Sequence, residues 1–219
     1  RSVKMHPQNV NYGLVGYPVL MTSDIVLYKG EVVPVGEDQL PHLELAREIV
    51  RRFNSIFGDV FPEPQAKLTR FPMIVGLDGT DKMSKSADNY IEIASAPDEI
   101  RQKVSGAFTD PARVRKSDPG HPEVCNVYTL HRMFTPDRLE EIEYECRNAG
   151  MGCVQCKRML AESIVEFFGP FRERRKELEA RPDYVRDVVM DGAARAGAIA
   201  QETIAEVRSA MNLVPQWMP

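Results

Sequence analysis

Two lysines and two serines lie close together in the segment Lys82-Met83-Ser84-Lys85-Ser86. The preceding run 76–81, Gly-Leu-Asp-Gly-Thr-Asp, favours a loop over a helix because glycine is a poor helix former. Cations and hydroxyl groups on a loop are suited to neutralising the charge that builds on nucleotide phosphates as a bond to them breaks. The alternative is a solvated basic turn, which is what most segments of this composition form.

A second set of residues has the chemistry of a small-molecule pocket. Asp24 lies on an otherwise apolar helical face, where a carboxylate is costly to bury unless a group such as an indole N–H donates to it. Alternatively, Asp24 caps a neighbouring element or points to solvent. The run Gly36-Glu37-Asp38-Gln39 follows a short β-branched segment and opens a helix, an arrangement that turns backbone N–H groups toward a ligand. A well-capped helix start would explain Glu37 and Asp38 equally well.

The four cysteines of the chain all fall within residues 125–156, at Cys125, Cys146, Cys153 and Cys156. The last two are three residues apart at a predicted helix start, so their sulfur atoms face the same way. In a chain expected to be cytosolic, such clustering favours a metal or redox site over disulfides. Unligated buried thiols and a zinc site are the alternatives, but zinc typically uses two close pairs. One close pair with two distant cysteines favours a [4Fe–4S] cluster.

The periodicity of apolar residues predicts the helices and strands that must position the lysine segment and the pocket residues around Asp24 and 36–39. Apolar residues recur at helical spacing over 14–28, which indicates a buried helix. A strand at 31–36 and an amphipathic helix at 37–57 follow, and the apolar run 73–75 leads as a strand into the lysine segment. This order predicts the α/β class, with part of a parallel sheet.

The composition changes after residue 93, and every later element is predicted to be a helix. The longest break is a linker at 109–122, rich in Asp, Pro and Gly. We therefore predict an α/β domain at 1–94 and an all-helical domain at 95–219. The predicted helices are 96–108, 123–133, 136–148, 153–168, 170–180 and 183–212.

Bulk composition limits the possible partners. The 219 residues carry a net charge of −4, which excludes a wholly basic nucleic-acid binder but leaves room for local basic surfaces. Basic clusters occur at 113–116, 157–158 and 172–176, and interleaved glutamates make the last cluster compatible with ion pairs on a helix surface. No apolar run is long enough to cross a bilayer and no leader is evident, so we expect a cytoplasmic protein with no membrane or DNA partner.

Taken in order, three segments resemble the bacterial tryptophanyl-tRNA synthetases: 16–25 (Gly-Tyr-Pro-Val-Leu-Met-Thr-Ser-Asp-Ile), 33–39 (Val-Pro-Val-Gly-Glu-Asp-Gln) with His42, and 82–86. The resemblance extends over essentially the whole chain. It implies a Rossmann-like class I aminoacyl-tRNA synthetase that activates L-tryptophan with ATP and Mg²⁺ and charges tRNA(Trp). It also implies a homodimer, as in intact members of the family. A tyrosine-specific relative, which typically carries a Gly-Ser-Asp-Gln-type segment at 36–39, and a non-catalytic RNA-binding or regulatory protein are the alternatives.

The same resemblance implies roles for individual residues. Asp24 would accept a hydrogen bond from the indole N–H, Met21 and Val35 would line the slot, and Gln39 would hold the polar end of the amino acid. Lys82 and Lys85 would stabilise pyrophosphate as the tryptophan carboxylate attacks the α-phosphate. The residues expected to contact ATP are Gly36, Glu37, Asp38, Met73, Lys82, Met83, Ser84, Lys85 and Ser86.

Two further features follow from comparison with this family. A subset of its bacterial members carries a [4Fe–4S] cluster on a similar four-cysteine pattern in the helical domain, which also holds the anticodon-binding region. The class additionally has a His-x-Gly-His phosphate signature, and none of the histidines of this chain lies in such a context. We therefore expect the C-terminal half of the Rossmann-like domain followed by the helical domain, a fragment that does not catalyse tryptophan-dependent ATP–pyrophosphate exchange by itself.

Overall fold

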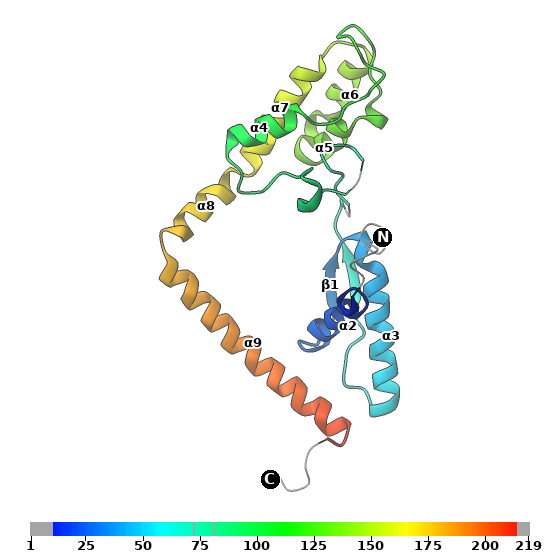
Figure 1. The fold of residues 1–219 in the computed structure, drawn as a ribbon, viewed down its shortest axis with the longest axis vertical. Coiled ribbons are helices and arrows are strands. Elements are labelled where there is room, and N and C mark those ends of the chain that lie inside the picture. Colours follow the sequence, from blue (N-terminus) through cyan, green and yellow to red (C-terminus); the bar gives the residue numbers. More distant parts are fainter. Residues whose placement is uncertain (1–10, 72, 81, 214–219) are drawn as a thin grey trace. The chain divides into compact units, whose positions relative to one another are not determined.

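The structure is a computed structural model that describes residues 11–71, 73–80 and 82–213 (Figure 1). The chain divides into two compact units, the first formed by 1–72 with 186–219 and the second by 73–185. The described part of each unit is considered separately below.

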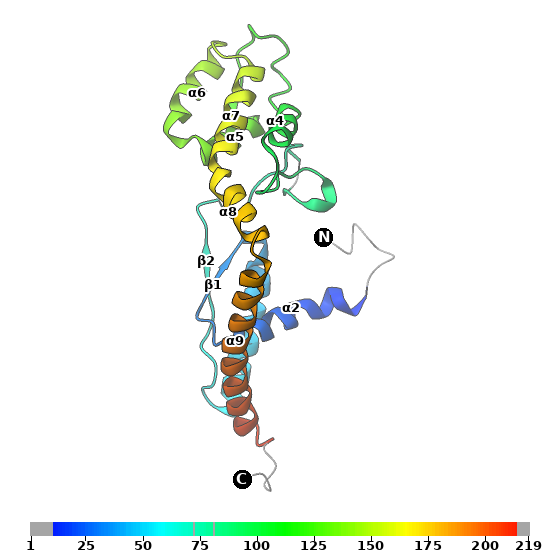
Figure 2. The same cartoon turned by 90° about the vertical axis from the view of Figure 1, so that its left-hand side faces the viewer.

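The first unit contains a two-stranded parallel sheet. Strands β1 (Val32–Val35) and β2 (Gln65–Leu68) lie side by side, with Val32 opposite Gln65 (Figure 2). Parallel strands need a crossover connection, and here it is a 3₁₀ turn at Glu37–Gln39 followed by α3 (Leu40–Phe57). This helical crossover between parallel strands confirms the predicted α/β class.

Helix α3 packs against α2 (Tyr12–Val26), and its apolar face explains why. Leu43, Ala46 and Val50 recur at helical spacing and are buried, as the amphipathic pattern predicts. The helix predicted at 14–28 is confirmed, but its predicted burial is wrong. Leu20 on α2 is 63% exposed, and other apolar side chains of that helix are also open to solvent.

The strand predicted at 73–75 is also wrong. Only Val75 takes part in a bridge, an isolated antiparallel one with Lys82. The second strand of the sheet is instead β2, which the sequence pattern missed. All four β2 residues, Gln-Ala-Lys-Leu, are exposed, so no alternation of apolar and polar residues marks this segment.

The second unit is helical, and each helix predicted there begins and ends within a few residues of its predicted bounds. Helix α7 packs against α4 and α5 (Figure 1). Its Leu160 and Ile164 are fully buried with Ile100 of α4 and Leu130 of α5. The helices are α4 (Pro97–Ser105), α5 (Asn126–Phe134), α6 (Leu139–Arg147), α7 (Cys153–Phe167) and α8 (Gly169–Glu179).

Helix α9 (Pro182–Ala210) begins in the second unit and continues into the first. Between residues 94 and 213 the structure has no strand, as predicted. The compact units divide at 72/73 and 185/186 rather than near 94, so the lysine loop belongs to the helical unit. Within the described ranges, every helix is too short or too polar to traverse a bilayer.

Candidate functional site

The lysine segment forms the predicted loop. Met83 N donates to Ile74 O at 2.8 Å, and Lys85–Ala87 form a single 3₁₀ turn. The side chains of Lys82 and Lys85 are exposed, while Asp81 lies outside the described residues. Asp88 ends the turn in the left-handed region at φ 50°. The loop therefore presents its lysines at the surface of the helical unit.

Asn89 organises this loop, a role that sequence reasoning missed. Its side chain is only 4% exposed, and its Oδ1 accepts a hydrogen bond from Ser84 N at 2.8 Å. Its Nδ2 donates to the carboxylate of Asp78 at 3.1 Å. Burial tends to raise the pKa of Asp78, but hydrogen bonds from Thr80 and Asn89 outweigh it, and this pKa lies below its usual range. The carboxylate therefore stays ionised as an acceptor at the base of the loop.

Gly76 fixes the base of the loop to the helices. A Cβ at this position would lie 2.0 Å from Asn89 Nδ2, so a larger residue would displace the buried carboxamide. Gly76 O accepts a 2.7 Å hydrogen bond from Asn126 Nδ2, which belongs to the first turn of α5. Leu77 O accepts another from Phe108 N at 2.7 Å. These contacts explain why the loop packs with the helical unit.

The residues predicted to bind tryptophan lie in the first unit. Asp24 is exposed on α2, and Met21, one turn earlier, is partly buried. Val35 ends β1, and Gln39 ends the following 3₁₀ turn with its Nε2 donating to Asp38 Oδ2 at 3.1 Å. The roles of these residues remain predictions.

A contact that sequence reasoning did not anticipate ties these two segments together. Tyr17 Oη and His42 Nε2 are 2.7 Å apart, and the two rings meet edge to face with centroids 4.9 Å apart. Tyr17 lies on the helix that carries Asp24, and His42 lies on α3, just after the Gly-Glu-Asp-Gln turn. The pair therefore fixes the helix of the predicted indole acceptor against the helix that follows the turn.

The candidates for ATP contact divide between the units. Gly36, Glu37 and Asp38 belong to the first unit, with Gly36 O accepting from Gln39 N at 3.0 Å in the 3₁₀ turn. Met73, 56% exposed, belongs to the second unit with the whole lysine loop. Each group is locally ordered, and the roles of its members in binding nucleotide stay predictions.

The four cysteines line one small cavity in the helical unit. Cys125 precedes the first turn of α5, Cys146 lies in the last turn of α6, and Cys153 and Cys156 face the cavity from the first turn of α7. All four are partly buried free thiols. The structure thus brings together the complete set that the spacing predicted.

The electrostatics of this cavity are dominated by burial and by Arg113. Burial raises the pKa of Cys156 to about 12 and also raises the pKa of Cys146, although the Arg113 guanidinium opposes the latter shift. Arg113 Nη1 lies 3.7 Å from Cys146 Sγ, and Arg113 Nε is buried without a hydrogen-bond partner. Protonated thiols at neutral pH would need a strongly positive group to become ligands.

Single-ion coordination does not match the present geometry. Within the described ranges, no three or more His, Cys, Asp or Glu side chains converge closely enough to hold a metal ion. Zinc bonds to sulfur are only about 2.3 Å long, so four zinc ligands must nearly touch one another. Gly120 lets one sulfur pack closely against the backbone, because a Cβ at this position would lie 2.5 Å from Cys146 Sγ. The metal centre at these cysteines stays a prediction.

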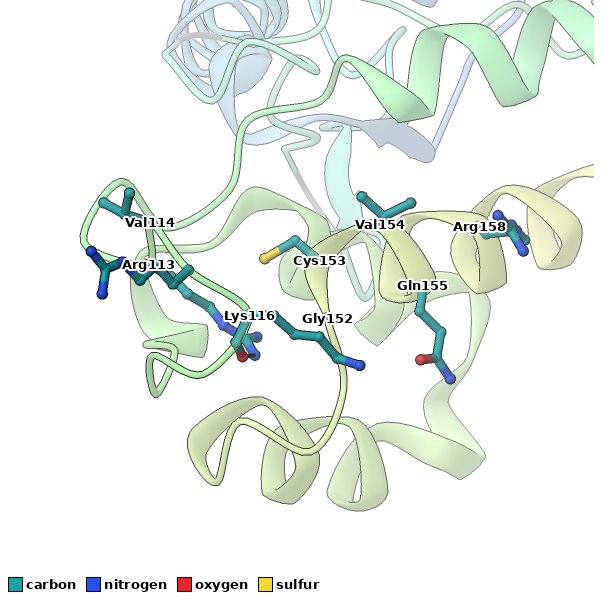
Figure 3. Close-up of a pocket in the computed structure, with 9 residues that line it drawn as sticks. Arg113, Val114, Lys116, Gly152, Cys153, Val154, Gln155 and Arg158 are labelled. Atoms are coloured by element: carbon teal, nitrogen blue, oxygen red, sulfur yellow. Dashed lines mark hydrogen bonds between the residues drawn. The ribbon is translucent and has the colours of Figure 1, made fainter.

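In two of the three basic clusters, several cations are engaged within the protein. On α8, Arg174 pairs with Glu177 at 2.9 Å and Arg175 with Glu179 at 2.7 Å, which confirms the interpretation of 172–176 as surface ion pairs. Lys157 Nζ donates to Ser105 O at 2.9 Å and so ties α7 to the end of α4. In the remaining cluster, Arg113, Arg115 and Lys116 line a separate pocket beside the start of α7 (Figure 3).

Comparison of the sequence with known proteins shows which family the chain resembles. The family model for class I tRNA synthetases (W and Y) matches residues 1–169. The tryptophan–tRNA ligase of Aquifex aeolicus is 52% identical over 204 residues, which are 92% of this chain and 51% of that protein. The corresponding enzyme of Deinococcus radiodurans is 47% identical over 209 residues, 94% of this chain and 63% of that protein.

Solved structures are similar as well. The crystal structure of tryptophanyl-tRNA synthetase from Campylobacter jejuni, complexed with ADP and tryptophan, superposes with a TM-score of 0.75 at 32% identity. The match covers 93% of this chain and 64% of that one. The chain therefore spans between about half and two thirds of the length of these relatives.

Proposed function

The chain belongs to the class I tRNA synthetases for tryptophan and tyrosine, and we propose that the protein containing it is a tryptophan–tRNA ligase. It would join L-tryptophan to ATP as tryptophanyl-adenylate and then transfer the amino acid to tRNA(Trp). The observation that carries this proposal is the 47–52% identity to tryptophan–tRNA ligases across most of the chain. Its α/β fold, rich in helices and with a small parallel sheet, is the Rossmann-like fold of this class.

In the first step a carboxylate oxygen of tryptophan would attack the α-phosphate of ATP, forming one P–O bond as the bond to pyrophosphate breaks. No covalent nucleophile of the enzyme is needed, so catalysis depends on positioning and charge stabilisation. Lys82 and Lys85 have the chemistry for the departing pyrophosphate, and Asn89 holds the backbone between them at Ser84. Mg²⁺ bound with ATP would supply further positive charge.

Selection of tryptophan would depend on Asp24. A carboxylate that accepts the indole N–H favours tryptophan, since a bound ring without a donor there would cover the acceptor and leave it unpaired. Met21 and Val35 would supply the apolar walls and Gln39 a contact to the amino acid's polar end. The hydrogen bond between Tyr17 and His42 supports this arrangement by joining α2 to α3.

We further propose that Cys125, Cys146, Cys153 and Cys156 hold a [4Fe–4S] cluster, with zinc as the alternative. Support comes from the shared cavity and from the unpartnered Arg113 Nε, which belongs to a residue that lines it. Thiolates are the ligands such clusters use, and Arg113 would offset part of their negative charge. A brown protein that dithionite bleaches, with iron and sulfide in equal amounts, would support the cluster. A colourless protein with stoichiometric zinc would refute it.

A homodimer and a cytoplasmic location complete the proposal. Leu20 and Tyr12 on α2 are 63% and 83% exposed, and apolar side chains gathered on one helix are typical of an interface. Sedimentation equilibrium of the complete protein would test the dimer. A monomer at micromolar concentration would contradict it.

Pyrophosphate exchange by the complete protein tests the activity. We expect exchange that depends on tryptophan, a loss of roughly 10²–10³-fold in kcat for Lys82→Ala or Lys85→Ala, and a raised KM for tryptophan in Asp24→Ala. Faster exchange with tyrosine would favour the tyrosine-specific alternative. RNA binding without exchange would favour the non-catalytic alternative. The same assay on residues 1–219 tests the expectation that this chain is inactive by itself.

A further inference from the structure

His131 on α5 is a fully buried histidine, at 0% exposure, and no step proposed above uses it. A buried polar side chain usually forms hydrogen bonds that join elements of the core, and this ring does join two helices. One of its neighbours, however, is a sulfur atom of the cysteine cavity. His131 Nε2 lies 3.3 Å from Cys156 Sγ.

Core packing fixes the distance between this ring and the sulfur. His131 lies in the second turn of α5, and Cys156 lies in the first turn of α7. Leu130, next to His131, and Leu160, one turn after Cys156, both belong to the buried core that joins these helices. The ring is therefore held in place from both sides of the contact.

The neighbours of the ring indicate which of its nitrogens carries a proton. Nε2 also lies 3.3 Å from Cys156 O, and a carbonyl can only accept a hydrogen bond. Full burial favours the neutral ring, which has a single N–H. The carbonyl therefore favours the tautomer with this proton on Nε2, where both acceptors of Cys156 lie.

Thr135 supports the same tautomer from the other side of the ring. Its Oγ1 lies 2.7 Å from His131 Nδ1. The hydroxyl also lies 3.1 Å from His131 O, but that carbonyl already accepts a hydrogen bond from Thr135 N at 2.8 Å. The hydroxyl can thus donate to Nδ1, which keeps the ring proton on Nε2.

A cysteine that binds a metal needs such a donor. The ligand is a thiolate, which accepts hydrogen bonds and has no proton to donate. Arg113 faces a different sulfur of the cavity, with its Nη1 at 3.7 Å from Cys146 Sγ. His131 and Arg113 therefore offer N–H groups to two different members of the four-cysteine set.

We propose that His131 is a positioning residue of the metal centre and donates a hydrogen bond from Nε2 to the thiolate sulfur of Cys156. This inference deepens the proposed function and rests on the proposed cluster. A hydrogen bond to a ligand sulfur strengthens when the cluster gains an electron, because part of the added negative charge lies on sulfur. The bond therefore stabilises the reduced cluster and raises its reduction potential.

The test is a potentiometric titration of the complete protein, purified without oxygen and reduced stepwise with dithionite. Visible absorbance and EPR spectroscopy follow the one-electron reduction. His131→Leu fills the site without a donor, and the ratio of reduced to oxidised cluster at a given potential should fall about tenfold, which is a shift of about 59 mV to lower potential. His131→Gln keeps an N–H donor and should restore most of this shift.

A milder variant decides the question if the buried substitution prevents folding. Thr135→Val removes the hydroxyl beside Nδ1 and leaves the ring in place, so the same ratio should fall about threefold. The matched control is Thr129→Val, the same substitution on the same helix. Its hydroxyl is exposed and lies 3.5 Å from Cys125 O, away from the ring, so the potential should shift by less than half as much.

The outcomes separate this inference from the proposals on which it rests. An iron-containing protein whose potential is unchanged in both His131→Leu and Thr135→Val would overturn the inference alone. So would equal shifts in His131→Gln and His131→Leu, or in Thr129→Val and Thr135→Val. A wild-type protein without iron would refute the proposed cluster and this inference with it. Tryptophan-dependent pyrophosphate exchange tests the proposed ligase activity separately, since the titration does not depend on it.

Discussion

The substitution Asn89→Ala should lower the activity of the complete protein by loosening the lysine loop. Asn89 is 4% exposed, and its side chain joins Ser84 N, at 2.8 Å, to the carboxylate of Asp78, at 3.1 Å. Removing a buried carboxamide and leaving a backbone N–H unpaired costs about 1–3 kcal/mol. A central value of about 2 kcal/mol, lost from a transition state that uses the ordered loop, corresponds to about 30-fold in kcat.

Steady-state pyrophosphate exchange measures this effect directly. We expect kcat to fall about 30-fold in Asn89→Ala, with little change in the KM for tryptophan, because the residues predicted to bind tryptophan belong to the other unit. Asn89→Asp should be at least as damaging at neutral pH. It places a second carboxylate beside Asp78, whose lowered pKa keeps it ionised.

The matched control is Asn148→Ala at the end of α6. Asn148 also donates a side-chain hydrogen bond, to Tyr144 O at 2.8 Å, but it is exposed and follows a different helix. Its removal should leave kcat within about twofold of wild type. Wild-type kcat in Asn89→Ala would refute the reasoning that an ordered loop presents the lysines to pyrophosphate.

Three further predictions concern the helical unit. Gly120→Ala should lower the iron or zinc content per chain, measured by metal analysis, because the new Cβ would lie 2.5 Å from Cys146 Sγ. The pKa of Asp110 lies below its usual range because hydrogen bonds from His121 and Ala112 outweigh the effect of burial. Its carboxylate therefore stabilises the fold above the ordinary Asp pKa of about 3.9, and this stability is lost as pH falls through the lower folded value. In urea unfolding, Asp110→Asn should show less pH dependence than wild type, and Leu160→Ala should lose about 2–5 kcal/mol because Leu160 is fully buried.

The sequence predicted the helices well because each carries its own signal. The face of Leu43, Ala46 and Val50 on α3 and the buried residues of α4, α5 and α7 recur at helical spacing, so local periodicity sufficed. Strand β2 has no such signal, because its exposed side chains leave backbone pairing with β1 as its main support. Neither pattern nor propensity reports which strand a backbone will pair with.

The sequence was sufficient to choose those site residues whose side-chain type itself defines the chemistry. Two lysines, two serines and four cysteines could be chosen from sequence, and the structure brings the four cysteines to one cavity. The residues that hold these groups in place could not be chosen. Asn89 acts through a buried carboxamide whose partners lie five and eleven residues earlier, and an isolated asparagine in a loop carries no pattern that reveals such bonds.

The cysteine cavity and the lysine loop are built on the same turn of α5. Cys125 lines the cavity and immediately precedes Asn126, whose side chain holds Gly76 O at 2.7 Å. Gly76 in turn leaves the space that the Asn89 carboxamide occupies. A shift of the first turn of α5 would therefore reach the backbone of the loop through two buried asparagines. For this reason, a change in exchange activity after substitution of Cys125 would report on the support of the loop as well as on the metal site.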